Sequence, residues 1–103
     1  MLINKGYSVG DIVCFKLVNG DEIVAKVAED NPDTFVVTKP CTVVPSQRGL
    51  GLIQSMFSAE LNSNITLNKS HVMMHSSVID DIKNHYIQTT TGIQPVTKGG
   101  IIT

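Results

Sequence analysis

The sequence predicts a mainly β fold: a small, strongly bent, five-stranded antiparallel open barrel with a C-terminal helix. Short runs rich in β-branched residues alternate with turn-forming residues, and a helical period appears near the end of the chain. With 103 residues, the chain has the length of one domain. We therefore expect a single domain over residues 1–103, with a β core at about 9–76, a helix at about 77–87 and a tail at 88–103.

The first hairpin lies within FKLVNGDEIVAKV and has an Asn19-Gly20 turn signal. A two-residue turn would place Lys26 on the same face as Val13, which mixes charged and apolar side chains. A three-residue loop over 18–20, with Gly20 left-handed in a bulge, separates the two kinds of side chain. Because a slip of one residue exchanges the faces of a strand, we favour this second register. It predicts the pairs Val13–Ala25, Phe15–Ile23 and Lys16–Glu22.

A polar turn and a third strand follow the hairpin. Asn31-Pro32-Asp33 has strong turn chemistry, and the β-branched residues from Thr34 onward suit a pleated sheet. Pro40 cannot donate a backbone hydrogen bond, so we expect a sheet edge or a bulge at that position. The three strands form an antiparallel meander.

The stretch 49–57 is less regular, and its apolar run is compatible with a strand or with a buried loop. Gly49 and Gly51 are expected to form a turn. Further along, NITLNKSHVMM predicts a strand at 65–67, a polar break at 68–71 and a short closing strand after it.

The last predicted element is a helix. Ser77 and Asp80 fit the Ser-x-x-Asp capping signature, so we expect the helix to begin at Ser77. Asp81 would then lie in the first turn, and Lys83 and His85 near the end, as the helix dipole favours. An apolar stripe for packing on the sheet consists of Val78, Ile82 and Tyr86. The Thr- and Gly-rich tail is expected to be poorly ordered by itself, and its GGIIT end could add a strand to a neighbour.

Composition and charge argue against several classes of protein. The net charge is −1, whereas a binder of duplex nucleic acid is usually basic. Two cysteines, Cys14 and Cys41, are too few for a disulfide framework and are interpreted as small hydrophobic residues. No apolar run approaches the roughly 20 residues that cross a bilayer, and no segment has the layout of a signal peptide. We expect no membrane association and a cytoplasmic location.

Cofactor binding and catalysis are not indicated either. His71 and His75 are four residues apart, but on a strand this spacing separates them by roughly 13 Å, and no third ligand is near in sequence. The chain shows no Ser-His-Asp order, no paired-carboxylate site and no reactive-cysteine signature. We therefore expect no metal, no cofactor and no enzymatic activity.

Two segments resemble the motifs of the Sm-like superfamily (Sm, LSm and Hfq). FKLVNGDEIVAKVAEDNPDTFVV is similar to the first motif, in which Leu17, Asn19, Gly20, Asp30 and Phe35 fall in order. ITLNKSHVMM resembles the second motif, with Asn68-Lys69-Ser70-His71 at the polar break where the family has Arg-Gly or Lys-His. The resemblance covers roughly residues 10–45 and 64–75, and the layout is similar to that of small Sm-like proteins of bacteriophages.

This resemblance implies a small SH3-like barrel that assembles with copies of itself into a cyclic homo-oligomer, in the host cytoplasm if the protein is phage-encoded. It also implies binding of single-stranded RNA by loops gathered around the pore. Such binding requires positive charge and planar groups that stack on bases. The candidate RNA-binding residues are Asn31, Phe35, Asn68, Lys69 and His71.

Other interpretations of these residues stay open. Asn31 with its acidic neighbours Asp30 and Asp33 is explained by turn formation alone, and Lys69 and His71 are compatible with ordinary solvated loop residues. The acidic balance of the chain favours an alternative function. In it, the protein is an oligomeric structural or protein-binding module that binds no nucleic acid.

Overall fold

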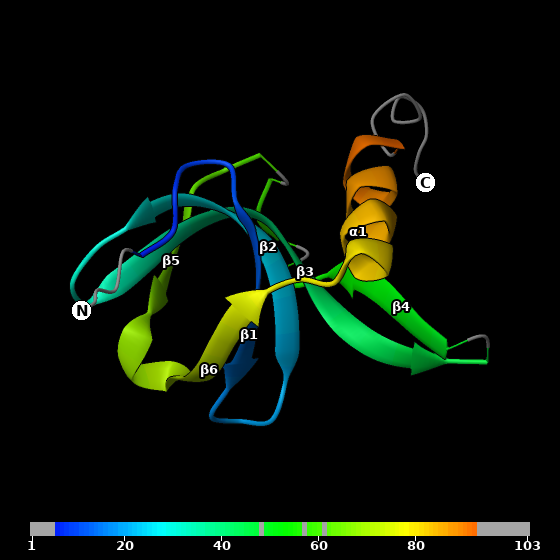
Figure 1. Ribbon diagram of the computed structural model, residues 1–103, viewed down its shortest axis with the longest axis horizontal. Coiled ribbons are helices and arrows are strands. Elements are labelled where there is room, and N and C mark those ends of the chain that lie inside the picture. The colour runs from blue at the N-terminus through cyan, green and yellow to red at the C-terminus, as the bar shows by residue number, and fades with distance from the viewer. Residues whose placement is uncertain (1–5, 48, 57, 61, 93–103) are drawn as a thin grey trace.

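The structure of the protein is a computed structural model, which describes residues 6–47, 49–56, 58–60 and 62–92. These residues form one antiparallel sheet and one α-helix (Figure 1). Along the sheet the strands stand in the order β4, β3, β2, β1, β6, and β5 pairs with β3. The elements in chain order are β1 (Ile12–Leu17), β2 (Glu22–Asp30), β3 (Thr34–Ser46), β4 (Gly49–Gln54), β5 (Ile65–Asn68), the 3₁₀ helix η1 (Lys69–His71), β6 (Val72–Ser77) and α1 (Asp80–Gly92).

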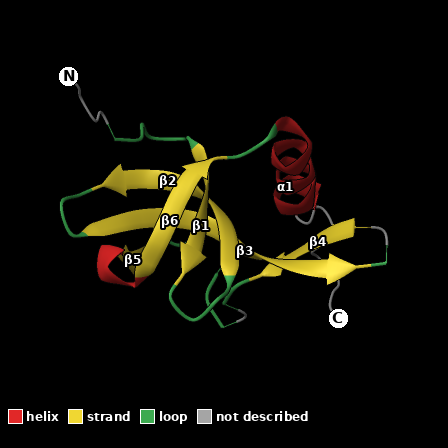
Figure 2. Cartoon of the chain, turned by 60° about the horizontal axis from the view of Figure 1, so that its bottom comes forward, coloured by secondary structure: helices red, strands yellow, loops and turns green. Residues whose placement is uncertain are grey.

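The long strand β3 organises the sheet, because different parts of it pair with different strands. Residues 34–37 pair with β5, and residues 41–46 pair with β4. The β3–β4 hairpin extends away from the bent part of the sheet (Figure 2). The expected open antiparallel sheet with a C-terminal helix is confirmed, but the described chain forms six strands instead of five. The additional strand is β4, and Gly51 lies within it and not in a turn.

The β1–β2 hairpin has the register that separates charged from apolar side chains. Val13 pairs with Ala25, Phe15 with Ile23 and Lys16 with Glu22. Gly20 has a φ of +99°, and its backbone N–H donates to the carbonyl of Leu17 at 2.9 Å. The predicted three-residue loop with a left-handed glycine is therefore confirmed.

A bulge interrupts the β2–β3 pairing next to Pro40. This agrees with the prediction from Pro40, which has no backbone N–H to donate. Lys26 pairs with Thr38 but Val24 pairs with Cys41, so β3 contains one more residue than β2 between these pairs. Lys39, inside the bulge, has a φ of +53°, which is unusual for a residue with a side chain.

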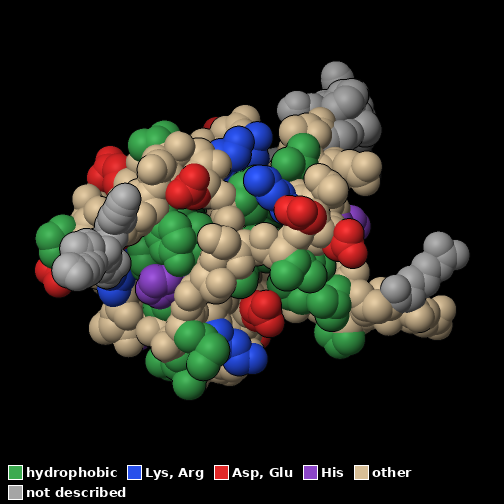
Figure 3. All heavy atoms as spheres, in the orientation of Figure 1, with side chains coloured by type: hydrophobic (Ala, Val, Ile, Leu, Met, Phe, Trp, Pro, Cys, Tyr) green, Lys and Arg blue, Asp and Glu red, His purple; other side chains and the backbone are tan. Residues whose placement is uncertain are grey.

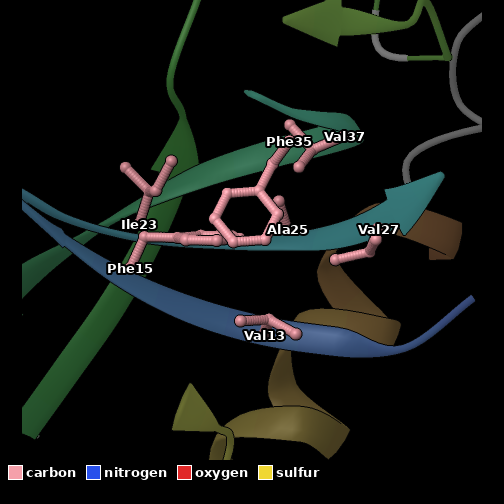
Figure 4. Packing of buried hydrophobic residues seen from close by; sticks show 7 residues of the cluster. All are labelled: Val13, Phe15, Ile23, Ala25, Val27, Phe35 and Val37. Atoms are coloured by element: carbon pink, nitrogen blue, oxygen red, sulfur yellow. The ribbon is translucent and has the colours of Figure 1, made fainter. Parts of the chain in front are cut away.

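The main core lies on one face of the sheet. Its fully buried side chains come from β1, β2 and β3, and the rings of Phe15 and Phe35 meet at its centre with their centroids 5.0 Å apart (Figure 4). Full burial of one such side chain contributes about 1.5–3 kcal/mol. The buried members of this cluster are Val13, Phe15, Ile23, Ala25, Val27, Phe35 and Val37.

The helix α1 packs on part of the opposite face of the sheet. Tyr86 is fully buried there against Val24 and Cys41, and the predicted stripe residues Val78 and Ile82 pack beside it. The Tyr86 hydroxyl donates to the carbonyl of Lys39 at 2.8 Å, so the helix is joined to the bulge of β3. The expected packing of these three side chains on the sheet is confirmed, but only Ile82 and Tyr86 belong to the helix and Val78 precedes it.

The predicted helix boundaries are wrong. Ser77 is the last residue of β6 and pairs with Val13, so pairing with β1 outweighs the local capping signature. The helix begins at Asp80 and continues to Gly92, which includes the first part of the predicted tail. Lys83 and His85 therefore lie in its first half, and its last turn contains no basic residue. The residues of the GGIIT end lie outside the described residues, so the prediction for them stays open.

Within the described residues, no helix is long and apolar enough to cross a membrane.

Candidate functional site

Two loops that are distant in sequence meet at one end of the sheet. The turn at residues 31–33 lies beside η1, because β5 pairs with the start of β3 and Thr34 faces Asn68. The backbone N–H of Lys69 donates to the carbonyl of Asp33 at 2.9 Å. Pairing of β5 with β3 thus brings together the two loops that carry the predicted RNA-binding residues.

Lys69 is paired with a carboxylate. Its ammonium lies 2.6 Å from Oδ1 of Asp30 and 4.4 Å from the centroid of the Phe35 ring. The other carboxylate oxygen of Asp30 accepts from the backbone N–H of Tyr7 at 2.9 Å. Burial raises the pKa of Asp30, but the hydrogen bonds from Lys69 and Tyr7 outweigh it, so this pKa lies below its ordinary value. The positive charge of Lys69 is therefore largely neutralised within the protein.

Phe35 belongs to the core. Its side chain is 1% exposed, and its ring packs against Phe15 and beneath the ammonium of Lys69. A nucleobase has no access to this ring in the structure. The expectation that Phe35 contacts RNA directly therefore needs correction: its place is below the surface that the two loops form.

Asn31 acts as a turn former. Its side-chain amide donates to Oε1 of Glu29 at 3.2 Å and to Oγ1 of Thr34 at 3.3 Å, and its backbone N–H donates to the carbonyl of Thr34. These bonds hold the turn between β2 and β3 in shape. The amide is half-buried, so it presents part of its polar surface to solvent beside η1.

Asn68 and His71 are exposed at the two ends of η1. Asn68 makes no side-chain capping bond to η1. The carbonyl of His71 accepts from the backbone N–H of Val18 at 2.9 Å, so η1 ends beside the β1–β2 loop. Of the five predicted residues, these two present the most accessible polar side chains.

An aromatic pair that the sequence did not indicate lies near the same end. The hydroxyl of Tyr7 and Nδ1 of His75 are 2.8 Å apart, with the donor set by the imidazole tautomer. The His75 ring makes T-shaped contacts with the rings of Tyr7 and Phe35, and both centroids lie 5.4 Å from its own. Burial raises the pKa of the Tyr7 hydroxyl above its ordinary value. Figure 3 shows a histidine beside hydrophobic side chains on the face that carries β5 and β6.

An open groove of about 340 Å³ lies beside β6, and we call it the β6 groove. Cys14 and Lys16 on β1, Glu22 on β2 and Met74 on β6 line it. Because neighbouring strand residues point to opposite faces, the groove lies on the face that α1 also covers, whereas the His75 ring points to the core face.

The described residues contain no group of three His, Cys, Asp or Glu side chains placed to hold a metal ion. No family model matches the chain, and no curated protein matches it.

Proposed function

We propose that the protein is a non-enzymatic, Sm-like subunit of a homo-oligomeric ring that assembles edge to edge through β4 and β6. The observation that carries this proposal is the state of the two terminal strands. In the described chain, β4 pairs only with β3 and β6 pairs only with β1. Each strand therefore presents one row of backbone donors and acceptors to solvent.

Neither edge carries the proline or charged residues that commonly prevent edge pairing. The sequences of β4 and β6, GLGLIQ and VMMHSS, contain no proline, lysine or acidic residue. Large apolar side chains are exposed on both: Leu50 is 55% and Ile53 46% exposed on β4, and Met73 is 60% and Met74 62% exposed on β6. Two such edges favour pairing with another chain.

The β6 groove fits the same arrangement. Leu52 of β4 packs on the face that α1 covers, which is also the face of the groove. If β4 of a second copy continued the sheet at β6, the apolar side chains of that face would come to lie over Met74. Pairing of two different edges is head-to-tail, and it closes into a ring when the rotation between copies fits. The strong bend of the sheet supports such a rotation.

Light scattering on three variants tests the assembly. We expect the wild type to have a mass several times that of one chain, and Met74→Lys and Ile53→Lys to be smaller with unchanged far-UV circular dichroism. Ile79→Lys is the control, because Ile79 is 69% exposed but lies outside both edge strands. A monomeric wild type, or edge variants that keep the full mass, would overturn the proposal.

Mixing the two edge variants tests whether the pairing is head-to-tail. Met74→Lys keeps an intact β4 edge and Ile53→Lys keeps an intact β6 edge, so an equimolar mixture should form dimers and grow no further. If β6 instead paired with β6, the Ile53→Lys protein would dimerise alone. That outcome would exclude a head-to-tail ring.

Single-stranded RNA is the ligand that we propose for this ring. The proposal is supported by the meeting of the turn at 31–33 with η1, which exposes Asn68 and His71 on each subunit. A ring repeats this surface in every copy, which increases the affinity for a strand that contacts several copies. Because Asp30 neutralises Lys69, we expect each subunit to bind only weakly by itself.

Fluorescence anisotropy with labelled oligo-U and oligo-A, at two salt concentrations, tests RNA binding. Affinity for RNA should fall as salt rises, since phosphate contacts release counterions. A Lys69→Ala, His71→Ala protein should bind more weakly if η1 contacts the strand. A ring that binds neither oligonucleotide would leave the alternative of an oligomeric protein-binding module.

A further inference from the structure

We propose that His75, held by Tyr7, is a binding site for an unpaired nucleobase on the core face of the sheet. The inference rests on the proposed binding of single-stranded RNA and adds a site to it. Neither residue belongs to the two loops in which the sequence predicts RNA contacts.

His75 is an exposed residue, yet two neighbours, Tyr7 and Phe35, define the orientation of its imidazole. The Tyr7 and Phe35 rings both make T-shaped contacts with it, at interplanar angles of 73° and 74°. The hydrogen bond between Tyr7 and Nδ1 prevents free rotation of the ring. A planar group whose orientation is already set loses little conformational entropy when a flat ligand stacks on it.

The position of Tyr7 depends on the charged pair nearby. Its backbone N–H donates to Asp30, and the chain approaches so closely that a Cβ at Gly6 would lie 2.7 Å from the Asp30 carboxylate. Gly6 has a φ of +74°, a conformation that glycine adopts without strain. Asp30 therefore holds Tyr7 on one side and Lys69 on the other.

The chemistry of the site favours a base over a phosphate. The charge of Lys69 is balanced by Asp30, so this region offers little net positive charge to an anion. The site instead offers a stacking surface and one polar atom, since Nε2 of His75 has no partner within the described part of the chain. Every base has a π face and edge atoms that can accept or donate to such a nitrogen.

A substitution series on the histidines gives the test, with labelled oligo-U and oligo-A as probes. We expect His75→Ala to weaken binding by about 5- to 150-fold, the range observed when a stacking side chain is removed. The dependence of affinity on salt should stay the same, because no phosphate contact is lost. His85→Ala is the matched control, since His85 is exposed on α1.

Two further variants separate stacking from hydrogen bonding. His75→Phe keeps a planar ring but has no nitrogen, so it should retain most of the affinity if stacking dominates. Tyr7→Phe removes the hydroxyl that orients the imidazole, and we expect a smaller loss than for His75→Ala. Far-UV circular dichroism establishes that each variant is folded.

Histidine side-chain NMR of the wild-type protein provides a readout that does not depend on any variant. On titration with oligo-U, the His75 imidazole signals should move and those of His85 should not. Titration with uridine and adenosine, which have no phosphate, distinguishes a free nucleoside from RNA. Nucleoside binding at His75 without tighter binding of the oligonucleotides would overturn RNA as the source of the base.

The remaining outcomes distinguish this inference from the function on which it rests. If the wild type binds RNA but His75→Ala binds equally well and the His75 signals do not move, the base site is wrong and the RNA function stands. If the wild type binds no oligonucleotide and no nucleoside, both are wrong.

Discussion

Replacing Asp30 by asparagine tests the contact on which the candidate site depends. The carboxylate accepts from Lys69 through one oxygen and from the Tyr7 backbone through the other. Asparagine keeps the shape but has no charge, and its amide nitrogen cannot accept from either donor. Asp30→Asn should therefore destabilise the protein without removing any packed side chain.

The magnitude follows from the burial of the pair. The Lys69 and Asp30 side chains are 31% and 15% exposed, so the pair is neither fully solvated nor buried. Fully exposed ion pairs contribute about 0–1 kcal/mol, and hydrogen bonds to charged groups about 1.5–3 kcal/mol. We expect Asp30→Asn to lower the free energy of unfolding by about 2 kcal/mol. For a domain of this size, that corresponds to a decrease in Tm of roughly 10 °C.

The difference in free energy of unfolding between the wild type and Asp30→Asn should depend on pH. Because the hydrogen bonds hold the pKa of Asp30 below its ordinary value of 3.8, the ionised carboxylate stabilises the folded state above that pH. The contribution is lost as the pH falls through the lower pKa of the folded protein. The difference in stability between wild type and Asp30→Asn should be full at neutral pH and narrow below about pH 4.

Urea denaturation of both proteins at neutral and acidic pH measures this difference. Asp33→Asn is a suitable control, because Asp33 lies in the same turn but is exposed and should change stability by less than about 0.5 kcal/mol. An Asp30→Asn protein as stable as the wild type at neutral pH would mean that the Asp30 carboxylate does not stabilise the fold. A difference that does not narrow in acid would refute the assigned role of the ionised carboxylate.

Other predictions concern the helix, the hairpin and the thiols. Tyr86→Phe should lower the free energy of unfolding in urea by about 1–2 kcal/mol, because it removes the 2.8 Å hydrogen bond to the carbonyl of Lys39. Tyr86→Ala should lower it by about 3–5 kcal/mol, and unchanged stability would contradict the packing of α1. Gly20→Ala should cost about 1 kcal/mol or more, since φ is +99°, and no loss would contradict the left-handed loop. A thiol reagent at about pH 8 should modify Cys14 before Cys41. Burial raises the pKa of both thiols, but Cys41 is buried, with a pKa of about 11, whereas Cys14 is only half-buried; equal rates would contradict the burial of Cys41.

Sequence reasoning succeeded where the chemistry is local. The Asn19-Gly20 signal and the separation of charged from apolar side chains determine the register of the first hairpin, and the structure has that register. Asn31-Pro32-Asp33 determines the next turn, and Pro40 the bulge in β3. In each case, the residues that specify the structure are neighbours in sequence or pair across a short hairpin.

The sequence predicted the structure incorrectly where pairing with another strand outweighed the local pattern of residues. Ser77 has the residue type of a helix cap, but pairing with Val13 keeps it in β6. The run GLGLIQ has no clear period, and only pairing with β3 makes it a strand. Neither strand assignment can be predicted from the local sequence, because each depends on pairing with another strand of the sheet.

In the candidate site too, the local sequence predicts some features and contacts between distant segments determine the others. Residue type alone identified Lys69 and His71 as polar loop residues beside a strand. Only the tertiary structure pairs Lys69 with Asp30, 39 positions away, and places His75 against Tyr7, 68 positions away. Charge compensation and ring orientation arise from contacts between segments that the sheet brings together. The sequence by itself therefore determined the hairpins and the types of residue in the loops, whereas the fold decided which of them remain free to bind a ligand.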